Sequence, residues 1–160
     1  MEDIKFLLKD GSQFVCRAIG LIVSGNKILL QGRKGKNTWG FPGGSITSFE
    51  TSKETIIREC NEEIGEKVKI KRLLAVVEDF FNYLDKYNVH QISFYYLVEL
   101  DENSNLLKTE EFDGIEEGKN FIFKWFDIDN SDTLIKPRQI FEKLKNNDNN
   151  IKHIILKEIQ

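Results

Sequence analysis

The chain has 160 residues, of which 40% are hydrophobic and 31% charged, and its formal net charge at pH 7 is −3. These values are typical of a globular domain, and the slight acidity argues against a general nucleic-acid or anionic-membrane binder. The first ten residues, MEDIKFLLKD, are charged throughout, and no apolar run approaches the ~18 residues of a membrane span. We therefore expect one domain over residues 1–160, no membrane segment and a cytoplasmic location. Cys16 and Cys60 lie among apolar residues, which favours buried free thiols of a reducing compartment over a disulfide or a zinc pair.

The first half of the chain alternates strand, turn and helix signals. Residues 14–23, FVCRAIGLIV, are rich in β-branched and apolar side chains and predict a strand, and Ser24-Gly25-Asn26 predicts a turn into a partner strand at 27–33. The following stretch, GKNTWGFPGG (35–44), has four glycines and is loop-like. A helix is predicted at about 51–65.

The second half is mainly strand-like. Strands are predicted at 68–82, where length allows a bend, at 89–100 and at 120–128, with an acidic, polar and mobile loop at 101–118 between the last two. Pro137 predicts the first turn of a last helix, and the tail IKHIILKEI fits either a strand or a helical turn. Helices after the second and the last strands predict an α+β or mixed α/β sandwich.

The helix at 51–65 has clear ends and two distinct faces. Thr51 and Glu54 have capping-box spacing, and Gly65 suits a left-handed C-terminal cap. At about 100° per residue, an apolar stripe faces the sheet, formed by Ile56, Ile57, Cys60 and Ile64. The neighbouring sector carries the carboxylates of Glu59, Glu62 and Glu63.

This acidic sector has two interpretations. It is either a solvated face, with Arg58 relieving the repulsion by pairing with Glu62 at i,i+4, or a metal site. Two observations favour a metal site: the carboxylates adjoin the buried stripe, and the helix follows a glycine-rich loop where backbone can approach a ligand closely. Hard carboxylate oxygens with open water positions suit Mg²⁺ or Mn²⁺, a site that substrate phosphates typically complete.

The same residues resemble a known motif. The pattern Gly44-x5-Glu50-x7-Arg58-Glu59-Cys60-x-Glu62-Glu63-x-Gly65 is similar to the Nudix box, G-x5-E-x7-R-E-U-x-E-E-x-G-U, where U is a bulky apolar residue, and all seven fixed positions are present. Cys60 and Glu66 stand at apolar positions of the motif, and Phe49 precedes Glu50 where glycine is common.

The resemblance covers about residues 10–130, including the lead-in Trp39-Gly-Phe-Pro-Gly-Gly44, and is greatest to bacterial MutT-like members. It implies a Nudix-type α/β/α sandwich with a mixed β-sheet. It also implies metal-dependent hydrolysis of a pyrophosphate bond in a nucleoside diphosphate linked to another moiety, such as a nucleoside triphosphate. A homodimer is also plausible, because members of the family often form dimers.

The resemblance also implies roles for individual residues. Glu59, Glu62 and Glu63 would hold Mg²⁺ or Mn²⁺, with Gly44 supplying a close backbone approach and a candidate carbonyl ligand. Glu59 or Glu62 would position or deprotonate the attacking water, and Arg58 would orient Glu50 as a supporting carboxylate. Cys60 lies on the buried stripe and is not expected to act as a nucleophile.

Candidates for substrate binding are more scattered along the chain: Arg17, Arg33, Phe41, Tyr83 and His90. Arg17 lies mid-strand among apolar residues and suits a phosphate contact or an internal ion pair. Arg33 precedes the glycine loop and could steer an anionic substrate or simply be solvated. Phe41 comes from the lead-in motif, Tyr83 could stack on a base, and His90 has either a site role or a structural one.

The resemblance also implies one more carboxylate at the site, from the loop at 101–118, because members of the family often have one there. The candidates are Glu111, Glu116 and Glu117. Two other interpretations stay open. One is a Nudix-fold module that binds nucleotides without hydrolysing them, and the other is an acidic helix on an unrelated sandwich. The sequence does not identify the nucleotide, because the box reads only the diphosphate and the metal.

Overall fold

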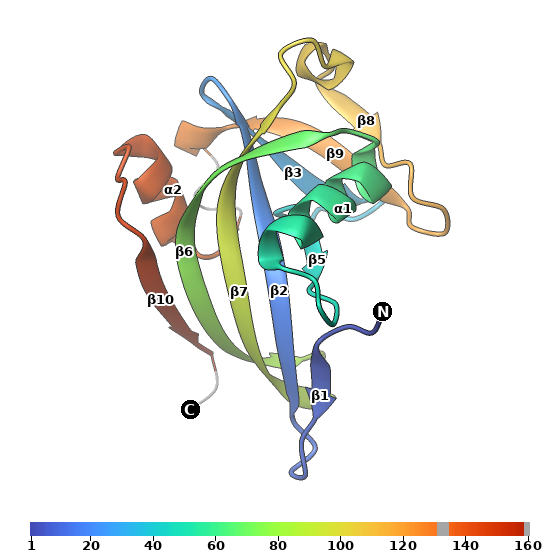
Figure 1. Cartoon of the computed structure of the whole chain (residues 1–160), viewed down its shortest axis with the longest axis vertical. Coiled ribbons are helices and arrows are strands. Elements are labelled where there is room, and N and C mark those ends of the chain that lie inside the picture. The colour runs from blue at the N-terminus through green and yellow to red at the C-terminus, as the bar shows by residue number, and fades with distance from the viewer. Residues whose placement is uncertain (131–134, 159–160) are drawn as a thin grey trace.

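The computed structural model describes residues 1–130 and 135–158. Figure 1 shows long strands curving around one another, with a helix on either side. The elements within these ranges are β1 (Lys5–Leu7), β2 (Gln13–Ser24), β3 (Lys27–Arg33), β4 (Trp39–Gly40), β5 (Gly43–Ser45), α1 (Ser52–Ile64), β6 (Val68–Tyr83), β7 (Tyr87–Leu100), the 3-10 turn η1 (Asn105–Lys108), β8 (Glu111–Asp113), β9 (Phe121–Asp127), the 3-10 turn η2 (Ile128–Asn130), α2 (Arg138–Lys145) and β10 (Lys152–Lys157).

The strands form one mixed sheet, as predicted. Their order is β10-β6-β7-β2-β3-β9-β8, with β1 and β5 paired to β2, and β4 paired to β3. The β2/β7 and β10/β6 pairs are parallel, and the others are antiparallel. The strands β2 and β3 pair only next to their turn, at Val23–Ile28 and Ser24–Lys27. Beyond that point they diverge, and the short strands β4 and β5 lie at the opening between them.

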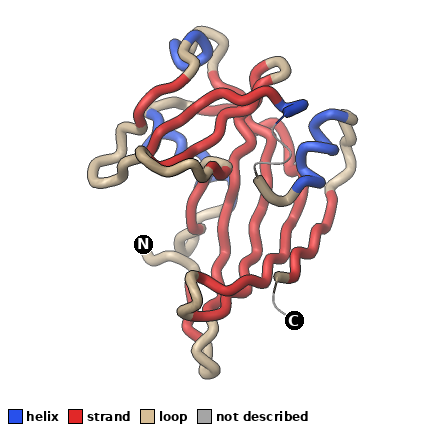
Figure 2. Tube along the Cα trace, turned by 180° about the vertical axis from the view of Figure 1, so that it is seen from behind, coloured by secondary structure: helices blue, strands red, loops and turns tan. Residues whose placement is uncertain are grey.

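The two faces of the sheet carry separate cores because side chains alternate along a strand. On β2, Ile19 and Leu21 join the cluster that contains Phe141 of α2, whereas Ala18 and Ile22 join the cluster that contains Ile56 of α1. The helices therefore cover opposite faces and give the predicted α/β/α layering, which Figure 2 shows from behind.

Several local expectations needed correction. Residues 101–118 are not one irregular loop, since η1 and β8 lie within them. Pro137 is the N-cap of α2 and not its first helical residue. The undecided tail is a strand, β10, which pairs in parallel with β6. The bend allowed in β6 is present as register shifts near Arg72 and Leu73.

Two expectations from composition can be compared with the described residues. Cys16 and Cys60 are both free thiols, Cys60 being buried and Cys16 only partly so. Neither helix in ranges 1–130 and 135–158 is long and apolar enough to cross a membrane.

Candidate active site

The helix α1 is held at both ends as its sequence predicts. The Thr51 hydroxyl accepts a hydrogen bond from the Glu54 N–H, and the Glu54 carboxylate accepts one from the Thr51 N–H. Gly65 ends the helix in the left-handed conformation at φ 72°. Of the predicted apolar stripe, Ile56, Cys60 and Ile64 are buried, but Ile57 is 44% exposed, so its place in the stripe was wrong. Because both ends of α1 are fixed, the positions of Glu59, Glu62 and Glu63 along the helix are fixed as well.

Glu50 and Arg58 form the support of the site. The guanidinium of Arg58 is bidentate on Glu50, with Nε 2.8 Å from Oε1 and Nη2 3.0 Å from Oε2. The Glu50 carboxylate also accepts hydrogen bonds from the N–H and hydroxyl of Thr47 and from the hydroxyl of Thr55. Arg58, with these hydroxyl and amide donors, lowers the pKa of Glu50 to about 2 despite burial. This pair is the bidentate arginine–carboxylate geometry that holds a guanidinium in one place.

Arg58 also contacts two predicted metal ligands. Its Nη1 lies 2.8 Å from Glu59 Oε1 and 3.2 Å from Glu62 Oε2. Glu59 is buried, whereas the side chain of Glu62 is 45% exposed at the opening of the site. Arg58 therefore keeps these like charges close together, as the i,i+4 spacing anticipated.

Glu63 is the most buried of the three predicted metal ligands on α1, at 2% exposure. Its Oε1 accepts a 2.7 Å hydrogen bond from the amide of Gln31 on β3. Its Oε2 is buried and, within the described residues, has no hydrogen-bond partner. Burial is the main reason that the pKa of Glu63 rises to about 7, opposed by the Gln31 hydrogen bond. An unsatisfied buried carboxylate oxygen is costly unless a cation binds it.

The glycine loop approaches α1 closely. A Cβ built on Gly44 would overlap the carboxylate of Glu59. The strand β5 that contains Gly44 is tied down by two arginines: Arg17 Nη2 donates to the Gly43 carbonyl at 3.2 Å, and Arg58 Nη2 donates to the Ser45 carbonyl at 3.2 Å. A side chain at Gly44 would therefore displace the Glu59 carboxylate from its observed position.

Gly44, Arg58 and the carboxylates of Glu59, Glu62 and Glu63 line one cavity of about 790 Å³ between β3, β4, β5, α1 and the turn that joins β8 to β9. Its wall contains the three α1 carboxylates and also a set of cations: Arg17, Arg33, Arg58 and Lys119. The side chains of Trp39 and Phe121 add aromatic surface. The cavity therefore offers metal-binding oxygens beside groups that attract phosphate.

The structure brings together two of the five predicted substrate-binding residues. Arg17 and Arg33 both line the cavity. The Nε of Arg17 is buried and, in the described part of the chain, has no hydrogen-bond partner. Its only hydrogen bond found there is to the Gly43 carbonyl, so the internal ion pair considered for Arg17 is not seen among residues 1–130 and 135–158.

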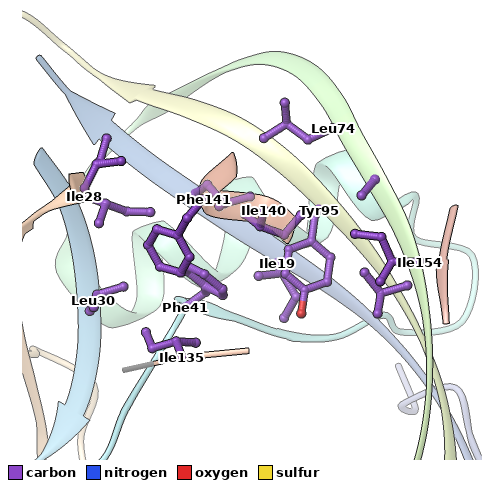
Figure 3. Packing of buried hydrophobic residues seen from close by; sticks show 14 residues of the cluster. Ile19, Ile28, Leu30, Phe41, Leu74, Tyr95, Ile135, Ile140, Phe141 and Ile154 are labelled. Carbon is purple, nitrogen blue, oxygen red and sulfur yellow. The ribbon is translucent and has the colours of Figure 1, made fainter. Parts of the chain in front are cut away.

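The other three candidates lie elsewhere. Phe41 is 9% exposed and packs in the core with Tyr95 and Phe141, at ring-centroid distances of 5.9 and 5.7 Å. Figure 3 shows it among these side chains. Tyr83 stacks on Tyr87 at the tip of the β6–β7 hairpin. None of the three is among the described residues that line the cavity.

His90 occupies a structural setting. Its ring stacks on Phe80 at 4.3 Å and contacts Phe14 edge-on at 5.4 Å. Its Nε2 lies 3.8 Å from Glu78 Oε2, and His153 contacts the same carboxylate at 2.7 Å. The aromatic contacts therefore favour the structural interpretation of His90.

Among the later carboxylates, Glu116 is the one near the α1 acids. Its charge contributes to the raised pKa of Glu63, and its Oε2 is buried without a partner among the described residues. The N–H of the neighbouring Ile115 donates to the Glu63 carbonyl at 2.9 Å, which ties this turn to α1. Glu111 instead points to Lys124, 3.6 Å away. Sequence reasoning did not find Gln31 or Lys119, because single polar residues in a strand and a turn carry no spacing signal.

Comparisons with known proteins identify the family of this chain. The model of the NUDIX domain family matches residues 15–144. The chain belongs to the Nudix family. The resemblance based on the box is thereby confirmed, and so are the mixed sheet and the two-sided helix packing as a Nudix fold.

Relatives of this Nudix domain are named for different substrates. The chain is 31% identical over 113 residues to the RNA pyrophosphohydrolase of Haemophilus influenzae strain PittEE, a match covering 60% of this chain and 58% of that protein. It is 43% identical over 60 residues to the ADP-ribose pyrophosphatase of Methanocaldococcus jannaschii, covering 36% of each. The chain thus matches little more than half of the first relative's length.

Solved Nudix structures share the fold. The Nudix hydrolase of Nitrosomonas europaea superposes with a TM-score of 0.61 at 17% identity, covering 88% of this chain and 78% of that one. The MutT Nudix hydrolase of Burkholderia pseudomallei gives 0.57 at 23% identity, covering 82% and 98%. At these identities the likeness supports the fold alone.

The carboxylate oxygens at this site are the type of ligand that a hard divalent cation prefers. Glu59, Glu62 and Glu63 offer carboxylate oxygens, and the Oε2 atoms of Glu63 and Glu116 are buried without protein donors in the described residues. Among residues 1–130 and 135–158, however, no group of three or more Asp, Glu, His or Cys side chains lies close enough together to hold a metal ion as the side chains now stand. Arg58 instead lies between Glu59 and Glu62, so these side chains would have to shift their contacts to bind one.

The Glu50–Arg58 pair predicts how stability depends on pH. The folded pKa of Glu50, about 2, lies below its ordinary value of 4.5, so its contribution is complete above pH 4.5 and is lost as pH falls toward 2. We expect Glu50→Gln to lower the free energy of unfolding at pH 7 by about 2 kcal/mol and to flatten the decline below pH 4.5. Urea unfolding in a chelating buffer at several pH values measures both effects.

The matched control for this substitution is Glu102→Gln, on the exposed turn after β7. It should leave the unfolding profile close to the parent's. An E50Q protein with a parent-like profile would show that the buried pair does not stabilise the fold.

Proposed function

We propose that this Nudix domain hydrolyses a pyrophosphate bond in a nucleoside diphosphate linked to another moiety, with Mg²⁺ or Mn²⁺ as cofactor. The observation that carries the proposal is the cavity in which three carboxylates of one helix face a half-buried arginine, Arg17, that no carboxylate neutralises among the described residues. Metal-binding oxygens and phosphate-binding cations are the groups that such a reaction needs side by side. The family match and the names of the relatives support the same reaction class.

The residues divide into ligands and supports. Glu59, Glu62 and Glu63 would hold the divalent ions, which neutralise phosphate charge and lower the pKa of a bound water. Glu59 or Glu62 would position the attacking water and accept its proton. Arg58 holds these carboxylates together while Glu50 fixes Arg58.

Two further side chains complete the proposed site. Arg17 would bind a phosphate oxygen through its unpartnered Nε, and Arg33 would attract the anionic substrate from the cavity's other wall. Glu116 would be the additional carboxylate from the later turn, since it is the candidate that lies near Glu63.

The relatives and the cavity together suggest an order of preference among nucleotide substrates. Two relatives are named RNA pyrophosphohydrolase and ADP-ribose pyrophosphatase, which suggests RNA or ADP-ribose as substrate. A pyrophosphate bond in RNA would lie in a 5′-triphosphate end, and the cavity of about 790 Å³ accommodates a nucleotide. The cations on its walls favour the substrate with more phosphate groups. We therefore rank nucleoside triphosphates and 5′-triphosphorylated RNA above ADP-ribose.

A substrate panel tests the proposal. Nucleoside triphosphates, a 5′-triphosphorylated RNA oligonucleotide and ADP-ribose are incubated with Mg²⁺ or Mn²⁺, and the products are separated by chromatography. We expect metal-dependent release of pyrophosphate or phosphate from the triphosphates, and a loss of turnover of about 10²-fold or more in Glu62→Gln with the fold retained. A fully active E62Q would show that the metal site is misplaced. Nucleotide binding without any turnover would instead favour the alternative of a sensor module.

A further inference from the structure

Lys119 lies in the turn between β8 and β9, at the wall of the cavity that the α1 carboxylates line. Its ammonium group is 2.6 Å from Glu116 Oε1 and lies over the ring of Phe121, 5.5 Å from the centroid. Gly118, in the left-handed conformation at φ 78°, allows the chain to turn just before it. The backbone of this turn is fixed to α1 through the hydrogen bond from Ile115 N–H to the Glu63 carbonyl. Lys119 is therefore held at the cavity by a defined turn.

The surroundings of Lys119 are strongly negative. Burial acts to lower the pKa of its ammonium group, but the hydrogen bond to Glu116 and the charges of that residue and of two α1 carboxylates raise it overall. The influence is mutual, since the charge of Lys119 lowers the pKa of Glu63. The ammonium group thus lies within the electrostatic field of the carboxylates that would hold a divalent ion.

This position has opposite consequences for the two ligands of the site. A divalent cation at the carboxylates is repelled by the Lys119 ammonium and competes with it for Glu116, whose second oxygen is buried without a partner in the described residues. A substrate phosphate in the same cavity is attracted by that ammonium. The side chain is 45% exposed, so it can leave Glu116 and reach toward the cavity.

We propose that Lys119 is a substrate-binding residue that contacts a phosphate group and weakens binding of the divalent ion when no substrate is present. The inference rests on the proposed function, because the phosphate it contacts belongs to that substrate. Lys119 would then couple the two ligands, since a bound phosphate draws the ammonium away from the metal's carboxylates.

A purely structural role for Lys119 predicts a different pattern. If its contacts with Glu116 and Phe121 only fixed the turn, removing the charge would loosen the turn and weaken metal and nucleotide binding together. The proposal instead requires the two affinities to change in opposite directions. The signs of the two changes therefore separate these roles.

The test uses Lys119→Met, which keeps most of the aliphatic side chain over Phe121 but removes the charge, and Lys119→Arg, which keeps the charge. The matched control is Lys34→Met, because Lys34 also pairs with an acid of this region, Asp113 at 2.7 Å, but does not line the cavity. Binding of Mn²⁺ alone is measured by the electron paramagnetic resonance of the free ion. Binding of a nucleoside triphosphate analogue with methylene groups at both the α,β and the β,γ bridges, which cannot be hydrolysed at either, is then measured at saturating Mn²⁺.

We expect K119M to bind Mn²⁺ about 3- to 10-fold more tightly and the nucleotide analogue about 10-fold more weakly than the parent. K119R and K34M should stay within about 2-fold of the parent for both ligands. Unchanged or weaker Mn²⁺ binding by K119M would overturn the inference, and so would unchanged binding of the analogue. Because both measurements are of binding, a parent protein that binds the analogue but hydrolyses nothing would contradict the proposed function alone.

Discussion

Replacing Gly44 by alanine should lower the catalytic rate by about 10²-fold while leaving the fold intact. Gly44 has no left-handed backbone strain, so alanine can adopt its conformation. The added Cβ would overlap the end of the Glu59 side chain, which is flexible and can swing away at little cost in stability. The displaced carboxylate would then move away from both Arg58 and the other proposed metal ligands, so we expect the loss in metal binding and turnover.

The neighbouring glycine provides the control. Gly43 has φ 142°, and a Cβ there would meet the backbone carbonyl of Ala18 on β2, which cannot move aside. We expect Gly43→Ala to lower the free energy of unfolding by about 2 kcal/mol or more. Denaturant unfolding and steady-state kinetics on both variants separate the two effects. A G44A protein with parent-like turnover would show that Glu59 does not need its observed position.

Glu63→Gln should make the protein more stable without metal and insensitive to metal. Glu63 is 2% exposed, with a buried carboxylate oxygen that lacks a partner in the described residues, so its negative charge is costly to bury. A neutral amide of the same size removes that charge and should raise the free energy of unfolding at pH 8 in a chelating buffer by about 1 kcal/mol. The parent should gain stability on adding Mg²⁺ or Mn²⁺, and E63Q should gain little.

Glu62→Gln is the matched comparison, since it makes the same chemical change one residue earlier on an exposed side chain. It should weaken the response to metal without the gain in metal-free stability. Thermal unfolding of the three proteins, with and without metal, gives the comparison. If E63Q were less stable than the parent in the chelating buffer and kept the full response to metal, Glu63 would not be a metal ligand.

The sequence predicted the elements and the box because both depend on local signals. The capping box and Gly65 fixed the ends of α1 to within one residue of those observed. Alternation of apolar side chains indicated most of the long strands, and the spacing from Gly44 to Gly65 identified the family. The order of strands and helices indicated an α+β or mixed α/β sandwich, and the mixed sheet itself was implied by the resemblance to the family.

Features that depend on tertiary contacts were not accessible in the same way. Helical periodicity placed Ile57 in the buried stripe, but its side chain is 44% exposed in the structure. Phe41 belongs to a glycine loop and was assigned to the substrate, yet it packs on Tyr95 and Phe141 from distant parts of the chain. Periodicity likewise gave Glu62 and Glu63 similar positions, although only one of them is buried.

The cavity wall opposite the box was the least predictable part. Gln31 reaches Glu63 only because β3 diverges from β2 beyond their turn. Glu116 and Lys119 reach the site because a short strand, β8, turns their segment back toward α1, within a stretch that composition indicated to be a loop. Such positions follow from the topology of the sheet and not from local sequence patterns.

Phe49 illustrates a departure from the family pattern that the structure clarifies. It adopts φ 65°, the left-handed conformation that glycine provides at this place in the motif, and its side chain is fully exposed. The turn is therefore preserved at some cost in backbone strain, and Glu50 still reaches Arg58.

The most direct test of the proposed metal site is a crystal structure of the protein with Mn²⁺, with the ion located by its anomalous scattering. We expect at least one Mn²⁺ at about 2.0–2.3 Å from carboxylate oxygens that include Glu63 and at least one of Glu59 and Glu62. The E63Q protein treated in the same way should show a weaker peak or none. A strong Mn²⁺ peak away from α1, with none beside these three glutamates, would contradict the proposed metal site.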